Sequence, residues 1–238
     1  MSGLKAIATA AFTASFVASP FVTAPFSGFR EDQLPFPQID PPVQPAGWAF
    51  SIWGLIYAWL VVSAVFGLWQ RRDSSGWDAA RPYLTGCLAI GTFWLAIANA
   101  SAIWATVTIF IMAILAIAAA TKAPGQDRWL FQAPVGILAG WLTAASFVSL
   151  GSTAAGYGLI ADSTGWAWIA IICALAVGVL VQVNTPAAPE YGITIIWALS
   201  GIIAANLPDQ PYVAALAGAG IAIMVMVIVV LRRAPAPA

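Results

Sequence analysis

Histidine is absent from the 238 residues of the chain, and cysteine occurs only twice. Without histidine, the protein has no imidazole to ligate haem or chlorophyll, and the common zinc-binding spacings are excluded. Cys87 and Cys173 both lie within apolar runs. A free cysteine in such a run is a small packing residue, so we predict no disulfide between them.

Charged residues are also scarce, at 8% of the chain, and nine basic side chains balance nine acidic ones. No basic run exceeds Arg232-Arg233, so nucleic-acid binding has no electrostatic basis. What is present in excess is apolar: the hydrophobic fraction is 61% and the mean hydropathy is +0.90. No water-soluble fold of this length carries such values, which predict a polytopic helical membrane protein.

The apolar runs predict an all-α transmembrane bundle of about eight spans. The run over 82–121 would be about 60 Å long as one helix, twice the hydrocarbon core, so it must fold back near Asn99-Ala-Ser101. We interpret the first run as a retained helix and not a signal peptide, because proline follows its small-residue sites Ser19 and Ala24. The expected spans are 4–24, 46–70, 82–100, 103–121, 130–151, 166–184, 191–207 and 211–231.

With eight spans, the basic residues gather on one side of the membrane. Because basic loops stay inside, this pattern predicts a bacterial inner-membrane protein with both termini in the cytoplasm. All charged residues fall in expected loops or termini, which argues against ion-coupled transporters, retinal proteins and acid–base or nucleophilic enzymes. Glu190 is the one acidic residue in a basic-side loop without a basic neighbour. The basic set is Lys5, Arg71, Arg72, Arg81, Lys122, Arg128, Arg232 and Arg233.

The second span is unusually aromatic, with Pro45 expected in its first turn. Phe50, Trp53 and Tyr57 follow i, i+3, i+7 spacing and share one helix face, and Gly54 is expected to leave room against it. Such a wall of rings suits a flat apolar ligand, whereas helix packing with an interfacial aromatic belt is the alternative.

The fifth span carries a Gly136-xxx-Gly140 pair, which predicts a close helix contact. One turn apart on this span, Trp141 and Ala145 could shape a pocket or simply pack. Trp141 and Ala145 are expected at a similar depth in the membrane to Trp53, Tyr57 and Asn99. Asn99 could equally cap a helix end. Five tryptophans near span ends are assigned to the interfacial belts: Trp69, Trp77, Trp129, Trp166 and Trp168.

The stretch P-A-G-W-A-F-S-I-W-G-L-I-Y resembles the second-helix signature of the TspO/MBR family. These are the bacterial tryptophan-rich sensory proteins related to the translocator protein, or peripheral benzodiazepine receptor. The fifth span, with Pro134, Gly140-Trp141 and Ala144-Ala145, is also similar to that family. The stretch over 191–201 looks like the longer bacterial members. The resemblance implies a five-helix TspO-like unit (1–155) and three additional transmembrane helices (156–231). The Ala-Pro composition of the C-terminus predicts a disordered tail (232–238).

By this resemblance, the five-helix unit binds porphyrins or other flat hydrophobic molecules, sterols included. The matching ligand-binding residues are Trp53, Tyr57, Trp141 and Ala145, with Asn99 a looser match. We therefore predict a membrane protein that binds a planar hydrophobic ligand, a tetrapyrrole or an isoprenoid or sterol-like molecule, for sensing or transfer without catalysis.

Two other functions remain open: an accessory subunit of a larger membrane complex, such as a photosynthetic one, and a transporter of a hydrophobic solute. No catalytic residue, metal site or obligatory cofactor is expected, but a non-covalently bound porphyrin, carotenoid or lipid is compatible with the pocket. Expected partners are membrane lipids, the ligand, and a second copy or other membrane subunits.

Overall fold

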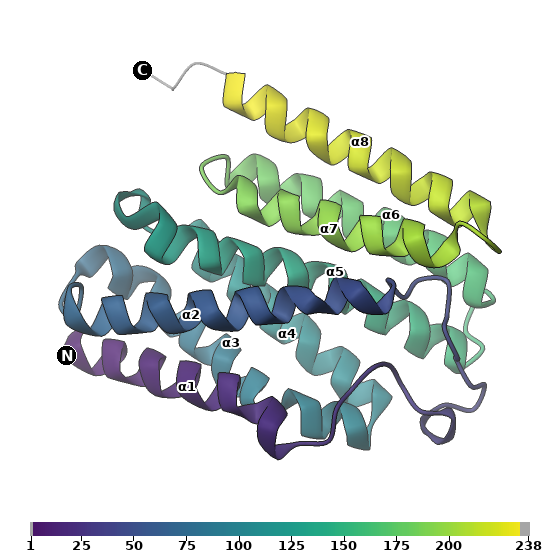
Figure 1. Ribbon diagram of the computed structural model, residues 1–238, viewed down its shortest axis with the longest axis horizontal. Helices are drawn as coiled ribbons and strands as arrows, with labels where there is room; N and C mark the ends of the chain where they lie inside the picture. The colour runs from purple at the N-terminus through teal and green to yellow at the C-terminus, as the bar shows by residue number, and fades with distance from the viewer. Residues whose placement is uncertain (1, 234–238) are drawn as a thin grey trace.

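The computed structural model describes residues 2–233, and this part of the chain folds into eight α-helices without a strand (Figure 1). A 3-10 turn, η2 (Gly47–Ser51), leads into α2, and a π-helical turn, η4 (Arg128–Gln132), leads into α5. The helices are α1 (Ser2–Val22), α2 (Ile52–Trp69), α3 (Ser75–Ala100), α4 (Ala102–Thr121), α5 (Ala133–Gly156), α6 (Ser163–Asn184), α7 (Pro189–Asn206) and α8 (Pro211–Arg233).

Seven of these helices are long and apolar enough to cross a membrane. The exception, α7, has only 18 residues, and Pro189, Glu190 and Asn206 at its ends lower its hydropathy. The predicted all-α polytopic bundle is therefore confirmed. The predicted reversal near Asn99 is also confirmed, since Ser101 alone separates α3 from α4 and its Oγ accepts a hydrogen bond from Trp104 N.

Helix α5 is the most buried of the seven spans and packs against α4, α6 and α7. The Gly136-Gly140 pair makes the predicted close contact, and its partner is α7. A Cβ atom on Gly140 would lie 2.4 Å from the backbone oxygen of Tyr191, so only glycine fits there. Tyr191 then donates its hydroxyl to Thr143 Oγ1 at 3.0 Å. These contacts tie α7 to α5.

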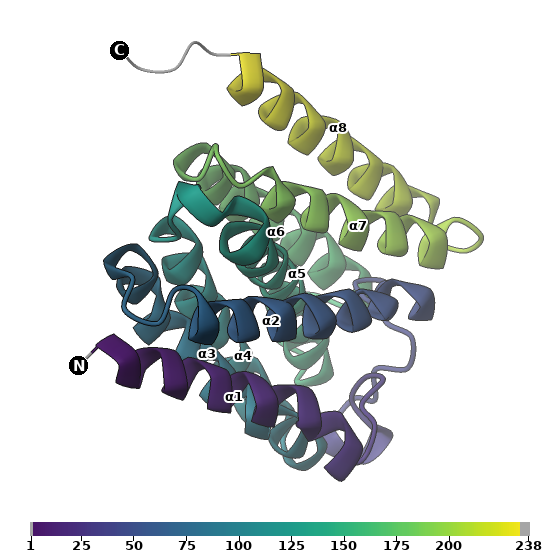
Figure 2. The same ribbon diagram turned by 60° about the vertical axis from the view of Figure 1, so that its left-hand side comes forward.

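The described ends of the chain lie at the same end of the bundle, the left end in Figure 1 and again in Figure 2. The predicted tail began at Arg232, but α8 continues through Arg233. Residues 234–238 lie outside the described part of the chain. The division into units 1–155 and 156–231 stays a prediction.

The entry to α2 differs from the prediction. Pro45 does not occupy the first turn of the α-helix, because η2 comes first and α2 begins only at Ile52. Residues 41–50, which we call the strap, run across the end of the bundle opposite the chain termini, where Ala46 N donates to Gly201 O of α7 at 3.0 Å. Gly54 does not face the aromatic wall as expected: it is exposed, and a Cβ atom there would meet nothing within 4 Å.

Candidate functional site

A cavity of about 330 Å³ lies among helices α1 to α5 at the end of the bundle opposite the chain termini. The C-terminal end of α1, the first half of α2 and the end of α3 form its sides. Helices α4 and α5 contribute further wall, and the strap lines its outer end. Its apolar, concave form is that of a small-molecule site.

The turn η2 and the start of α2 together contribute the predicted aromatic wall. Phe50, Trp53 and Tyr57 all line the cavity, so the shared face inferred from their spacing is present. Trp53 and Tyr57 are stacked with their ring centroids 5.3 Å apart. Trp141 of α5 meets Phe50 and Trp53 edge-on at 5.7 and 6.2 Å. The structure thus brings the second-helix rings and Trp141 together, and Ala145 lines the cavity beside them.

Asn99 is the predicted site residue that the structure does not bring to this wall. It lies at the end of α3, where its Nδ2 donates to Leu95 O at 2.9 Å and to Ala24 O at 3.1 Å. Asn99 therefore holds the chain that leaves α1, which is the helix-end role that its sequence position equally allowed.

Arg30 fastens the same loop from the other side by donating to Asn99 O at 3.0 Å. Asp32 accepts from Arg30 Nε at 3.0 Å, and this hydrogen bond lowers the pKa of the Asp32 carboxyl. The loop that borders the cavity is thus fixed to the α3 end by polar contacts outside the cavity.

Sequence reasoning missed several wall residues from other helices. Phe16 of α1 lies edge-on to Trp53 at 5.9 Å and to Tyr57 at 5.3 Å. Trp94 of α3 contacts Phe26 at 5.3 Å and donates its indole N–H to Ala105 O. Their aromatic character inside apolar spans was visible but does not distinguish a cavity wall from ordinary packing. Ala198, which brings α7 to the cavity, carried no signal at all.

Polar groups around the cavity fall into two kinds. Ser149 is satisfied, because its hydroxyl shares a hydrogen bond with Thr106 at 2.7 Å and Thr106 reaches Thr153 at 2.8 Å. Trp141 Nε1, in contrast, is buried and has no hydrogen-bond partner. A buried donor without an acceptor is costly. Among the described residues that line the cavity, none is charged.

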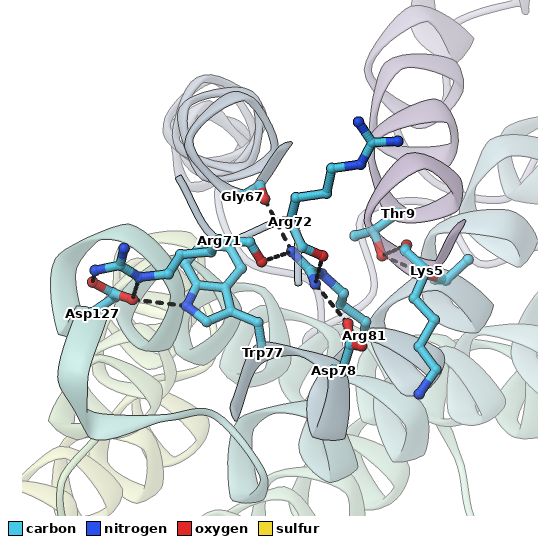
Figure 3. A network of polar contacts seen from close by, with 10 residues as sticks. Lys5, Thr9, Gly67, Arg71, Arg72, Trp77, Asp78, Arg81 and Asp127 are labelled. Carbon is cyan, nitrogen blue, oxygen red and sulfur yellow. Dashed lines mark hydrogen bonds and ion pairs between the residues drawn. The ribbon is translucent and has the colours of Figure 1, made fainter. Parts of the chain in front are cut away.

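The opposite end of the bundle carries a polar network (Figure 3). Asp127 accepts from Arg71 Nε at 2.7 Å and from Trp77 Nε1 at 2.8 Å, and the Asp127 hydrogen bond raises the pKa of Arg71. Arg81 donates to Asp78 Oδ1 at 2.6 Å and to the backbone oxygens of Gly67, Arg71 and Arg72, at the C-terminal end of α2. A cation there also complements the helix dipole.

Two expectations about residues near helix ends are wrong. Arg81 is not in a loop but inside α3, with 1% of its surface exposed, because α3 begins seven residues before the predicted span, at Ser75 instead of 82. Trp77 and Trp166 do not face lipid: they are 2% and 8% exposed, and their indole N–H groups bond Asp127 and Leu159 O. Glu190 also has a basic partner, since Arg128 Nη2 lies 2.5 Å from its Oε1.

Within residues 2–233, no group of three or more histidine, cysteine, aspartate or glutamate side chains is placed to hold a metal ion. No curated protein and no solved structure matches the chain. The family model described as TSPO-like protein matches residues 6–230, which is nearly the whole chain and includes the three C-terminal helices. The chain is therefore a multi-pass membrane protein that belongs to the TSPO-like family.

Proposed function

We propose that this protein binds a planar or elongated hydrophobic ligand in the cavity between α1 and α5 and holds it for sensing or transfer, without catalysis. The ligand class is a tetrapyrrole or an isoprenoid or sterol-like molecule. The observation that carries the proposal is the apolar cavity itself, with the rings of Trp53, Tyr57 and Trp141 on its wall.

The wall chemistry supports this ligand class. Edge-on and stacked rings from α1, α2 and α5 leave flat apolar faces, against which a planar molecule gains contact without losing hydrogen bonds to water. The charge-free wall offers no carboxylate or amine for proton transfer, which supports binding without chemistry.

The size of the cavity narrows the choice further. At about 330 Å³ it lies at the lower end of the range of about 300–1,000 Å³ that is usual for ligand pockets. This volume favours a slim ligand, such as an isoprenoid chain or one edge of a tetrapyrrole, over a fully enclosed macrocycle.

The basic residues support a placement in a bacterial inner membrane with both termini in the cytoplasm. The start of α1, the end of α2 and the end of α8 all carry basic side chains: Lys5, Arg71, Arg72, Arg232 and Arg233. Basic ends of this kind stay on the cytoplasmic side. The cavity, near the other end of the bundle, then lies in the outer half of the membrane.

Fluorescence quenching tests the binding proposal. Titration of the purified protein with protoporphyrin IX should quench tryptophan emission to saturation. Trp141→Phe should remove more of the quenchable emission than Trp168→Phe, because Trp141 borders the cavity and Trp168 lies exposed on α6.

Quenching that never saturates, or that is equal in the two variants, would contradict the proposal. Stable copurification with other membrane subunits, without saturable ligand binding, would instead favour an accessory subunit. A hydrophobic solute that crosses proteoliposomes only when the protein is present would favour a transporter.

A further inference from the structure

Helix α7 is bonded to the strap at three places along its length. Trp197 Nε1 donates to Ala49 O at 2.8 Å, Ala46 N donates to Gly201 O at 3.0 Å, and Asn206 Nδ2 donates to Pro42 O at 2.9 Å. The donors and acceptors on α7 lie on successive turns, so the strap runs along this helix.

At Gly201 the strap also packs directly against the backbone of α7. A Cβ atom on Gly201 would lie 2.8 Å from the Cβ atoms of both Ala49 and Pro45. Real Cβ atoms do not approach so closely, so any larger residue at this position must push the strap away from α7. One turn back, the rings of Trp48 and Trp197 meet edge-on at 4.9 Å.

The strap has few internal hydrogen bonds with which to hold its own shape. Three of its residues are prolines, Pro41, Pro42 and Pro45, which have no backbone N–H to donate. Before η2 begins at Gly47, the backbone bond within the strap is Gln44 N to Pro41 O, and Ala49 N to Ala46 O then leads into η2. The contacts with α7 therefore do much to fix the position of the strap.

Helix α7, in contrast, is anchored independently of the strap. Glu190 in its first turn is paired with Arg128, and Tyr191 and Thr194 in its first two turns lie against Gly140 of α5. It is thus a fixed reference against which the strap is placed. Ala198, between the contacts at positions 197 and 201, itself lines the cavity.

We infer that α7 is a positioning element of the cavity: through Trp197, Gly201 and Asn206 it holds the strap, and so sets the shape of the cavity and the choice of ligand. The strap contributes Pro41, Gln44, Pro45 and Phe50 to the wall, so a shift of the strap changes that wall directly. The part that concerns ligand choice rests on the proposed function, whereas the positioning of the strap does not.

Hydrogen exchange of the ligand-free protein tests the positioning. Gly201→Ala should raise the exchange rate of the amides over 46–49 about tenfold, and Trp197→Phe, which removes one hydrogen bond, about three- to tenfold. Gly218→Ala on α8 is the matched control, because a Cβ atom there would meet only Ile203 Cδ1 at 3.9 Å. Unchanged exchange over 46–49 in both strap variants would overturn the inference.

Ligand selectivity separates positioning from a general loss of stability. We would compare the affinities for protoporphyrin IX and for geranylgeraniol in the wild type, Gly201→Ala, Trp197→Phe and Gly218→Ala. The ratio of the two affinities should change about threefold or more in the first two variants and stay the same in the control. Destabilisation alone would lower both affinities together and leave the ratio unchanged.

The outcomes distinguish the two proposals. If the wild type binds neither probe, the proposed function fails, and the exchange data still decide whether α7 holds the strap. If the wild type binds and both strap variants keep the wild-type ratio, the role of α7 in ligand choice is wrong while the binding function stands.

Discussion

At the scale of single residues, Gly140 has the least space for a side chain. Any Cβ atom there meets the backbone oxygen of Tyr191, which cannot rotate aside as a side chain can. We expect Gly140→Ala to lower the free energy of unfolding by about 1–3 kcal/mol through overpacking. Thermal unfolding in one defined detergent measures this, with Gly54→Ala as control, because a Cβ atom there meets nothing within 4 Å. Equal melting temperatures would contradict the close α5–α7 contact.

The unpartnered indole of Trp141 leads to a second prediction. Burying this N–H without an acceptor costs about 1–3 kcal/mol, and that cost disappears when the N–H is removed. We therefore expect Trp141→Phe to be nearly neutral for the stability of the ligand-free protein, since the lost ring contacts offset the gain. Trp77→Phe is the comparison, because its indole N–H is bonded to Asp127 and its loss should lower stability. Similar losses in the two variants would show that Trp141 has a partner after all.

At the scale of elements, Asp127 joins the turn before α5 to the junction of α2 and α3. Its carboxylate is the acceptor for both Arg71 and the buried Trp77, so Asp127→Ala leaves a buried N–H unpaired. We expect a loss of about 1–3 kcal/mol in the free energy of unfolding. Asp32→Ala is the matched control: it removes a carboxylate that also pairs with an arginine but is solvent-exposed, so it should leave the melting temperature unchanged. Equal changes of melting temperature in the two variants would mean that the network around Asp127 contributes no more to stability than an exposed ion pair.

The elements themselves were largely predictable, and the reasons are physical. Hydrophobic runs of fixed length mark spans, and a GxxxG pair marks close helix contact, so the bundle and the Gly140 contact follow from local patterns. Trp77 and Arg81 were misplaced because hydropathy marks where apolar sequence stops, whereas a helix continues as long as its polar side chains find partners. Arg81 finds four acceptors at the end of α2 and at Asp78, which no local pattern encodes.

At the scale of the whole molecule, the shared end of both described termini gives a topology that labelling can check. In a background with Cys87→Ser and Cys173→Ser, we expect Ile160→Cys to react with a membrane-impermeant maleimide added outside intact cells. Ser74→Cys should react only after the membrane is opened, because it lies at the basic end of the bundle, whereas Ile160 is 92% exposed at the other end. The reverse pattern would invert the proposed orientation.

The depth of the cavity residues in the membrane was predictable from the sequence, but the direction that they face around their helix axes was not. The spacing of Phe50, Trp53 and Tyr57 placed them on one face, yet only the packing of α5 against α2 could show that Trp141 meets that face. The contribution of α7 to the cavity could not be predicted from the sequence. Ala198 and Gly201 are small residues that form no recognisable pattern, and the strap residues that Gly201 contacts lie about 150 positions earlier in the chain. Asn99 was expected at the site because its depth in the membrane matched that of the other residues. Its side chain instead donates to Ala24 O, in the segment that follows α1.

The three bonds between α7 and the strap have a consequence for synthesis. The junction of α2 and α3 closes through partners only 9–14 positions apart, so it can form as soon as that hairpin enters the membrane. The strap carbonyls of Ala49 and Pro42 receive their donors from residues 148 and 164 positions downstream. Translation must therefore pass Asn206 before the cavity wall is complete, and a chain truncated before α7 would lack the contacts that hold the strap.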